Sequence, residues 1–193
     1  CVLDYALLSA PGAPLKQALL DAKIGKDIYG SFEDGIKQTY FSIVAKGANL
    51  SRKEEFIKVI RDTLTKIAEE GIDKKAVTAG INYYEFRFRE ADFSSYPKGL
   101  MYGLDILSSW LYDDTKPFCE VQLLEGFEFL KKALEEGYFE ELIRKYLLDN
   151  THGAILSLVP EKGLAAKRDK ELEEKLENYR KSLSDEELTR MVE

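Results

Sequence analysis

The sequence predicts an α+β fold, in which an antiparallel sheet packs against several amphipathic helices and a charged helical extension follows at the C-terminal end. Three observations predict it. Apolar residues recur at helical spacing in several segments, two short segments alternate as strands do, and charge rises sharply after Pro160. We therefore expect one α+β domain over residues 1–160 and the start of a separate helical segment over 161–193.

Composition limits the classes of partner. The chain has 193 residues, of which 45% are apolar and 33% charged, as in a globular protein. Its net charge of −7 disfavours binding to a phosphate backbone, so no nucleic acid partner is expected. No apolar run approaches the roughly 18 residues that span a bilayer, so no membrane partner is expected. Two cysteines favour a reducing compartment, which for a bacterial protein is the cytoplasm.

Two helices separated by a break are expected at the start of the chain. Val2–Leu8 has a helical apolar pattern, and the Pro11-Gly12-Ala13-Pro14 stretch interrupts it. Leu15–Ile24 then resumes the pattern. Next, Ile28–Phe32 and Gln38–Ala45 alternate in the manner of strands, and the turn residues between them predict an antiparallel pair.

Several further helices are predicted from capping and periodicity. Ser51 and Glu54 have the spacing of a capping box, followed by an apolar stripe that ends at Gly71. The other predicted helices cover residues 74–91, 98–111, 120–134 and 139–148, and the second of these carries Leu100, Leu104, Leu107 and Leu111 on one face. Ala154–Val159 ends at a proline, which predicts a last strand.

The C-terminal extension differs in composition from the rest. Of its 33 residues, 18 are charged, and a thin apolar stripe remains. That stripe consists of Leu172, Leu176, Tyr179 and Leu183. Ser184 and Glu187 form a second capping-box pattern, so a further helix is expected to begin there. We expect the extension to project from the domain.

The sequence offers no complete active site. His152 is the only histidine, so no zinc motif with two imidazoles can occur, and its spacing from Cys1 and Cys119 is not that of metal ligands. We therefore expect neither metal ligands nor catalytic residues in this chain. His152 is interpreted as a turn residue. The adjacent pairs Asp113-Asp114 and Glu135-Glu136 would diverge on a helix and so cannot converge on a substrate.

Glu85 and Arg89 are spaced to form an ion pair within one helix. An alternative is that the arginines of the Glu85–Glu90 stretch hold a carboxylate from another domain.

Several segments resemble one enzyme family when taken together and in order. They are Leu7–Leu15, Gly25–Asp27, Glu85–Glu90, Pro97–Leu100, Trp110–Asp113 and Leu142–Asn150, the last followed by Val159-Pro160. In this order they resemble the presequence proteases, the peptidasome branch of the pitrilysin/insulinase zinc metallopeptidases.

The resemblance implies that the chain is part of an enzyme. Such proteins are clamshells of four related α+β domains, with two in each half and a helical hairpin linker between the halves. An inverted zinc motif lies in the first domain and an Arg/Tyr pair that assists catalysis lies in the last. This chain resembles the second domain followed by the start of the linker. The implied cofactor is zinc held outside this chain, and the implied partners are peptide substrates and the other domains of the same polypeptide.

The resemblance also implies a substrate-binding strand. In the related insulin-degrading enzymes, a strand edge of the second domain holds the N-terminal part of the substrate, and the matching residues here are Ile28, Tyr29, Gly30 and Ser31. Those enzymes carry a Gly-Gly pair where this sequence has a single glycine. The expected function is thus a non-catalytic chamber wall that accommodates short unfolded peptides. A stand-alone interaction module, recruiting a partner through its sheet edge or its charged helix, is the alternative.

Overall fold

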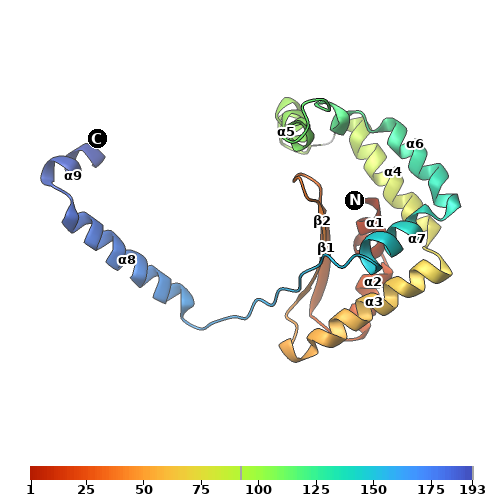
Figure 1. The fold of residues 1–193 in the computed structure, drawn as a ribbon, viewed down its shortest axis with the longest axis horizontal. Helices are drawn as coiled ribbons and strands as arrows, with labels where there is room; N and C mark the ends of the chain where they lie inside the picture. The colour runs from red at the N-terminus through yellow and green to blue at the C-terminus, as the bar shows by residue number, and fades with distance from the viewer. Residues whose placement is uncertain (92, 193) are drawn as a thin grey trace. The chain divides into compact units, whose positions relative to one another are not determined.

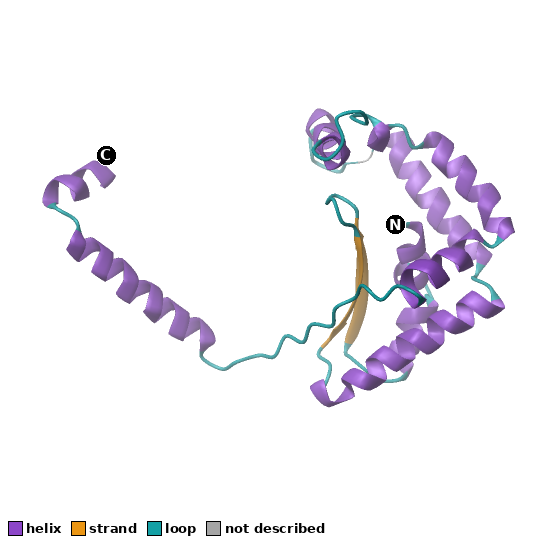
Figure 2. Cartoon of the chain, viewed as in Figure 1, coloured by secondary structure: helices purple, strands orange, loops and turns teal. Residues whose placement is uncertain are grey.

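The computed structural model describes residues 1–91 and 93–192 and confirms the α+β class. The chain separates into two compact units, Cys1–Gly153 and Ala154–Glu193. The first unit contains the strands, coloured orange in Figure 2, and a hydrophobic core. Glu193, the last residue of the predicted extension, lies outside the described residues.

The N-terminal helices form the centre of the core. Helix α1, Val2–Asp4, continues directly into a π-helical turn, η1, Tyr5–Ser9. The chain then reverses and enters α2, Pro14–Asp21, whose first position is the proline, as a fixed φ favours. The side chains of Leu7, Leu8, Leu15 and Leu19 are fully buried. The predicted pair of helices with a break between them is confirmed.

The two predicted strands form an antiparallel ribbon. Strand β1, Asp27–Glu33, pairs with β2, Tyr40–Lys46, and the register places Gly30 opposite Ile43. One face of the ribbon packs on the core through Ile28, Phe41, Ile43 and Ala45. Helices α1 and α2 lie on that side of the strands (Figure 1).

The long helix predicted after residue 51 is confirmed, but its predicted capping box is wrong. Helix α3, Lys53–Glu70, is preceded by a 3-10 turn, η2, Leu50–Arg52. Ser51 lies inside that turn, where its backbone N–H and its hydroxyl both donate to the Asn49 side chain. Asn49 therefore caps η2, two residues before the position that the sequence pattern suggested, and α3 itself follows Arg52 without a side-chain cap.

The remaining helices of the first unit follow the predicted order. Helix α4, Lys74–Glu90, is capped by Asp73, whose carboxylate accepts from two backbone N–H groups. The elements after it are α5, Lys98–Trp110; η3, Cys119–Val121; α6, Leu124–Ala133; η4, Leu134–Glu136; α7, Tyr138–Leu142; and η5, Ile143–Leu148. The helix predicted from residue 120 thus begins as a separate 3-10 turn, and α6 itself starts four residues later.

The predicted strand over Ala154–Val159 is wrong. The backbone from 151 to 160 has no regular secondary structure, and the side chains of Leu156 and Leu158 are 82% and 88% exposed. A strand requires a neighbouring strand to accept and donate its hydrogen bonds. Within the described residues the only sheet is β1–β2, so this segment has none.

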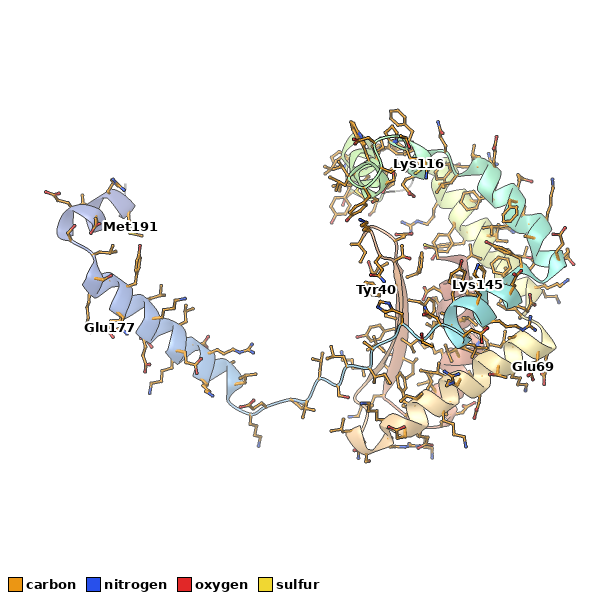
Figure 3. The ribbon with its side chains drawn as sticks, viewed as in Figure 1. Tyr40, Glu69, Lys116, Lys145, Glu177 and Met191 are labelled. Carbon is orange, nitrogen blue, oxygen red and sulfur yellow. The ribbon has the colours of Figure 1, made fainter. Side chains whose placement is uncertain are left out.

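The second unit consists of two helices after that extended segment. Helix α8, Leu164–Ser182, has no buried residue, and Figure 3 shows its side chains, Glu177 among them, standing out around the helix axis. Helix α9, Asp185–Val192, begins with the predicted capping box, in which Ser184 and Glu187 hydrogen-bond each other's backbone and side chain. None of the helices in the described part of the chain is both long and apolar enough to cross a bilayer.

A buried carboxylate ties α6 to α4. Glu85 pairs with Arg89 on its own helix, Oε1 to Nη2 being 2.6 Å, which confirms the predicted pair. Its second oxygen lies 2.7 Å from Nζ of Lys131 on α6. Hydrogen bonds from Lys131 and then Arg89 hold the pKa of Glu85 below its usual range. A carboxylate with a lowered pKa stabilises the fold at neutral pH and ceases to do so as pH falls through that value.

We expect Glu85→Gln to lower the free energy of unfolding at pH 7 and to weaken its dependence on acid, because the ionised carboxylate is the form that binds Lys131 and Arg89. Denaturant titrations at pH 7 and at steps below the usual glutamate pKa of 4.5 measure both effects. Glu90→Gln, on the same helix at an exposed position, is the control and should keep the acid sensitivity of the unmodified chain. Identical acid dependence in Glu85→Gln and the unmodified chain would contradict the assignment.

Candidate functional site

The four residues predicted to bind substrate all lie on β1, but the strand divides them between its two faces. Ile28 is fully buried and Gly30 faces the same helices. Tyr29, 48% exposed, and Ser31 lie on the opposite face. There the Ser31 hydroxyl is 3.0 Å from that of Ser42, its partner on β2.

We call that second face the open ribbon face. Its members are Asp27, Tyr29, Ser31 and Glu33 of β1 and Tyr40, Ser42, Val44 and Lys46 of β2. Tyr40, labelled in Figure 3, is 52% exposed, while Ser31, Ser42 and Val44 are partly buried. Tyr29, Ser31, Ser42 and Val44 form the uncharged middle of the face, between the Asp27–Lys46 pair at one end and Glu33 at the other. This uncharged middle can contact an extended chain without selecting for charge.

Gly30 is required by the fold. A Cβ atom added there would lie 2.5 Å from Cδ1 of Leu8 and closer still to the carbonyl oxygen of Ser42. The strand runs in regular register at this point, so Gly30 is neither a bulge nor a turn. The room that the glycine leaves is filled by Leu8 of η1 and by the β2 backbone. A visiting peptide would have to approach β1 along its edge instead.

The edge of β1 away from β2 has no partner strand among the described residues. An edge strand presents alternate N–H and C=O groups outward, where an extended peptide can add as a further strand. Such pairing depends on the peptide backbone, so it accepts many sequences. This edge and the open ribbon face beside it form the candidate site.

No group of three or more His, Cys, Asp or Glu side chains in the described part of the chain is placed to hold a metal ion. Cys1 Sγ is 3.5 Å from Asp34, Cys119 Sγ is 3.6 Å from Glu120, and both thiols are exposed. The exposed His152 donates its backbone N–H to the Asn150 side chain, as a turn residue does. These residues do not fit a zinc ion.

One carboxylate of each adjacent pair is engaged in a structural contact. Hydrogen bonds from Thr115 lower the pKa of Asp113, which also pairs with Lys116 at 3.2 Å. Glu135 pairs with Lys74 at the start of α4. Because its pKa is lowered, Asp113 is a poor general acid.

One buried titratable group was not singled out from the sequence. Asp4 is about nine-tenths buried in α1, burial raises its pKa, and its Oδ1 atom has no hydrogen-bond partner among the described residues. Burial of the neighbouring Tyr84 raises the pKa of that phenol, and the charge of Asp4 raises it further. Tyr84 packs edge-on against Tyr5. A single aspartate in an apolar helix belongs to no sequence motif, so its burial could not be predicted from the sequence.

Comparison with known proteins bears on this domain directly. Residues 2–84 match the family described as the Peptidase M16 inactive domain. The chain is 44% identical over 192 residues to Protein HypA of Clostridium perfringens, an alignment that covers 100% of this chain and 20% of that protein. The chain matches the M16 peptidases of the pitrilysin/insulinase family.

Presequence proteases are among the relatives, which confirms the resemblance seen in the sequence. Identity is 34% over 195 residues to presequence protease 1, chloroplastic/mitochondrial, of Arabidopsis thaliana, covering 98% of this chain and 18% of that protein. It is 26% over 196 residues to the mitochondrial presequence protease of Xenopus laevis, covering 100% and 19%. The chain spans about a fifth of the length of the relatives it matches. The M16 match includes β1, β2 and hence the whole candidate site.

We expect Gly30→Ala to lower the free energy of unfolding by about 1–3 kcal/mol, the usual cost of forcing an atom into a filled space. Gly103→Ala is the control, because nothing lies within 4 Å of an added Cβ there and α5 gains the better helix former. Denaturant unfolding of the two variants should therefore give changes of opposite sign. Unaltered stability in Gly30→Ala would mean that the Leu8 contact does not constrain the ribbon.

Proposed function

We propose that this chain is a non-catalytic wall of the peptide-degrading chamber in a longer zinc-dependent metalloendopeptidase. The observation that carries the proposal is that β1 and β2 lie in a match to the M16 inactive domain, within relatives about five times as long. In this arrangement residues 1–160 form the wall domain and 161–193 begin the helical linker. Two exposed free thiols, Cys1 and Cys119, are compatible with a reducing compartment, which in a bacterium is the cytoplasm.

Zinc would be held by residues outside this chain. The described residues contain no metal-binding group. The resemblance to the pitrilysin/insulinase enzymes implies a zinc motif in a preceding domain. The zinc would supply an activated water and polarise the scissile carbonyl. This chain would contribute positioning, by holding part of the peptide at a fixed place relative to that centre.

The β1 edge would hold short unfolded peptides by main-chain pairing. Its strand is fixed from behind by Ile28 and Gly30, which pack on the helices, so the edge needs little ordering when a peptide arrives. Tyr29 stands beside the edge on the open ribbon face and would cover the peptide's side chains. Backbone pairing suits an enzyme that degrades many sequences.

The chain by itself should retain no zinc after dialysis and should cleave no peptide, because a catalytic zinc site needs three protein ligands and a bound water. Elemental analysis and a fluorogenic peptide assay measure the two properties. The full-length polypeptide should cleave the same peptides and lose that activity on treatment with a chelator. Stoichiometric zinc in the chain alone, or an inactive full-length protein, would overturn the proposal.

Photo-cross-linking in the full-length polypeptide tests substrate contact. A benzophenone amino acid in place of Tyr29 should capture a bound peptide, whereas the same group in place of Val44 should capture much less. Val44 lies directly opposite Tyr29 on the same face, one strand spacing of about 4.8 Å further from the proposed peptide. Equal or stronger capture at Val44, or none at either position in an active enzyme, would contradict binding at the β1 edge.

A further inference from the structure

Helix α5 carries an apolar stripe that nothing in the described residues covers. The stripe has the spacing of a core-facing helix and consists of Leu100, Leu104, Leu107 and Leu111. These leucines are 53%, 50%, 42% and 70% exposed, and α5 has no buried residue. In α3, by contrast, the comparable positions Leu64 and Ile67 are 2% and 8% exposed. The same pattern is thus buried in one helix and bare in the other.

Apart from Asp105, the other residues of α5 either contact neighbouring residues or are uncharged. Tyr102 packs edge-on against Phe93, and the Ser109 hydroxyl donates to the carbonyl of Lys116 in the following loop. Between residues 99 and 112 the only charged side chain is Asp105. Trp110, 49% exposed, stands at the end of the helix. Leucines with a tryptophan and almost no charge are the composition of a permanent interface core.

We propose that the leucine stripe of α5 is an intramolecular interface, covered in the complete protein by an apolar face of another domain of the same polypeptide. This inference rests on the proposed function, in which the chain is one part of a longer enzyme.

The length of the relatives supports this occupant. Alignments covering 98–100% of this chain, α5 included, account for only 18–20% of each of those proteins. The relatives therefore contain about four times as much further polypeptide as this chain provides. A bare stripe of this kind would otherwise promote association between molecules, so it requires a cover that is always present. A peptide substrate, which comes and goes, would leave the stripe exposed between turnovers.

Cysteine accessibility in the full-length polypeptide tests the proposal. Leu104→Cys and Leu107→Cys are compared with Leu50→Cys, and maleimide labelling of each site is followed by peptide-resolved mass spectrometry. Leu50 is the matched control because it is also a leucine, is 58% exposed and lies outside α5, in η2. The two stripe cysteines should label at least about tenfold more slowly than the control in the native protein, and equally fast after denaturation.

Each alternative occupant gives a different result. Slow labelling that appears only as the protein concentration rises would identify a second copy of the chain as the cover. Slow labelling only at saturating peptide would identify the substrate as the cover. Either result, or native labelling as fast as at Leu50→Cys, overturns the inference. Peptide cleavage by the same variants tests the proposed function separately. An active enzyme whose stripe cysteines label freely would contradict this inference and leave the proposed function intact.

Discussion

The contact between Gly30 of β1 and Leu8 of η1 is the constraint on which the candidate site depends. A two-stranded ribbon is marginal in water without a surface to pack on. Here the missing Cβ lets the strand lie directly on Leu8, and Ile28 next to it is fully buried. Because the ribbon is held from one face, its other face and the outer edge of β1 remain available. The features that fix the strand are thus separate from those that could meet a peptide.

Local signals were sufficient to predict most of the secondary structure. Helices α3 and α4 each combine a full apolar period with a terminating signal, and the two strands alternate on either side of a turn. Both signals act within one element and need no knowledge of its neighbours. The predicted capping box at Ser51 failed because Ser51 lies inside a 3-10 turn, where its own backbone N–H and hydroxyl donate to Asn49. Cap positions are decided by such competition between adjacent polar side chains.

Predictions that depended on a partner from elsewhere in the chain were wrong or incomplete. The segment 154–159 has the composition of a strand, yet pairing requires a second strand that the described residues do not provide. The stripe on α5 predicts the helix correctly and says nothing about what covers it. For the site, the resemblance located β1 but could not divide Ile28 and Gly30, which face the helices, from Tyr29 and Ser31. That division required the register and the position of Leu8.

The extended segment Ala154–Val159 also bears on how the chain behaves when it is concentrated apart from other protein. It is uncharged, and its four large apolar side chains, Ile155, Leu156, Leu158 and Val159, are each more than half exposed. Segments of this length and composition stack with copies of themselves into dry, interdigitated sheets. Pro160 and the charged residues after it act as gatekeepers at one end only. Fibrillar self-association would therefore begin at this segment, and it would require no loss of helical structure in the first unit.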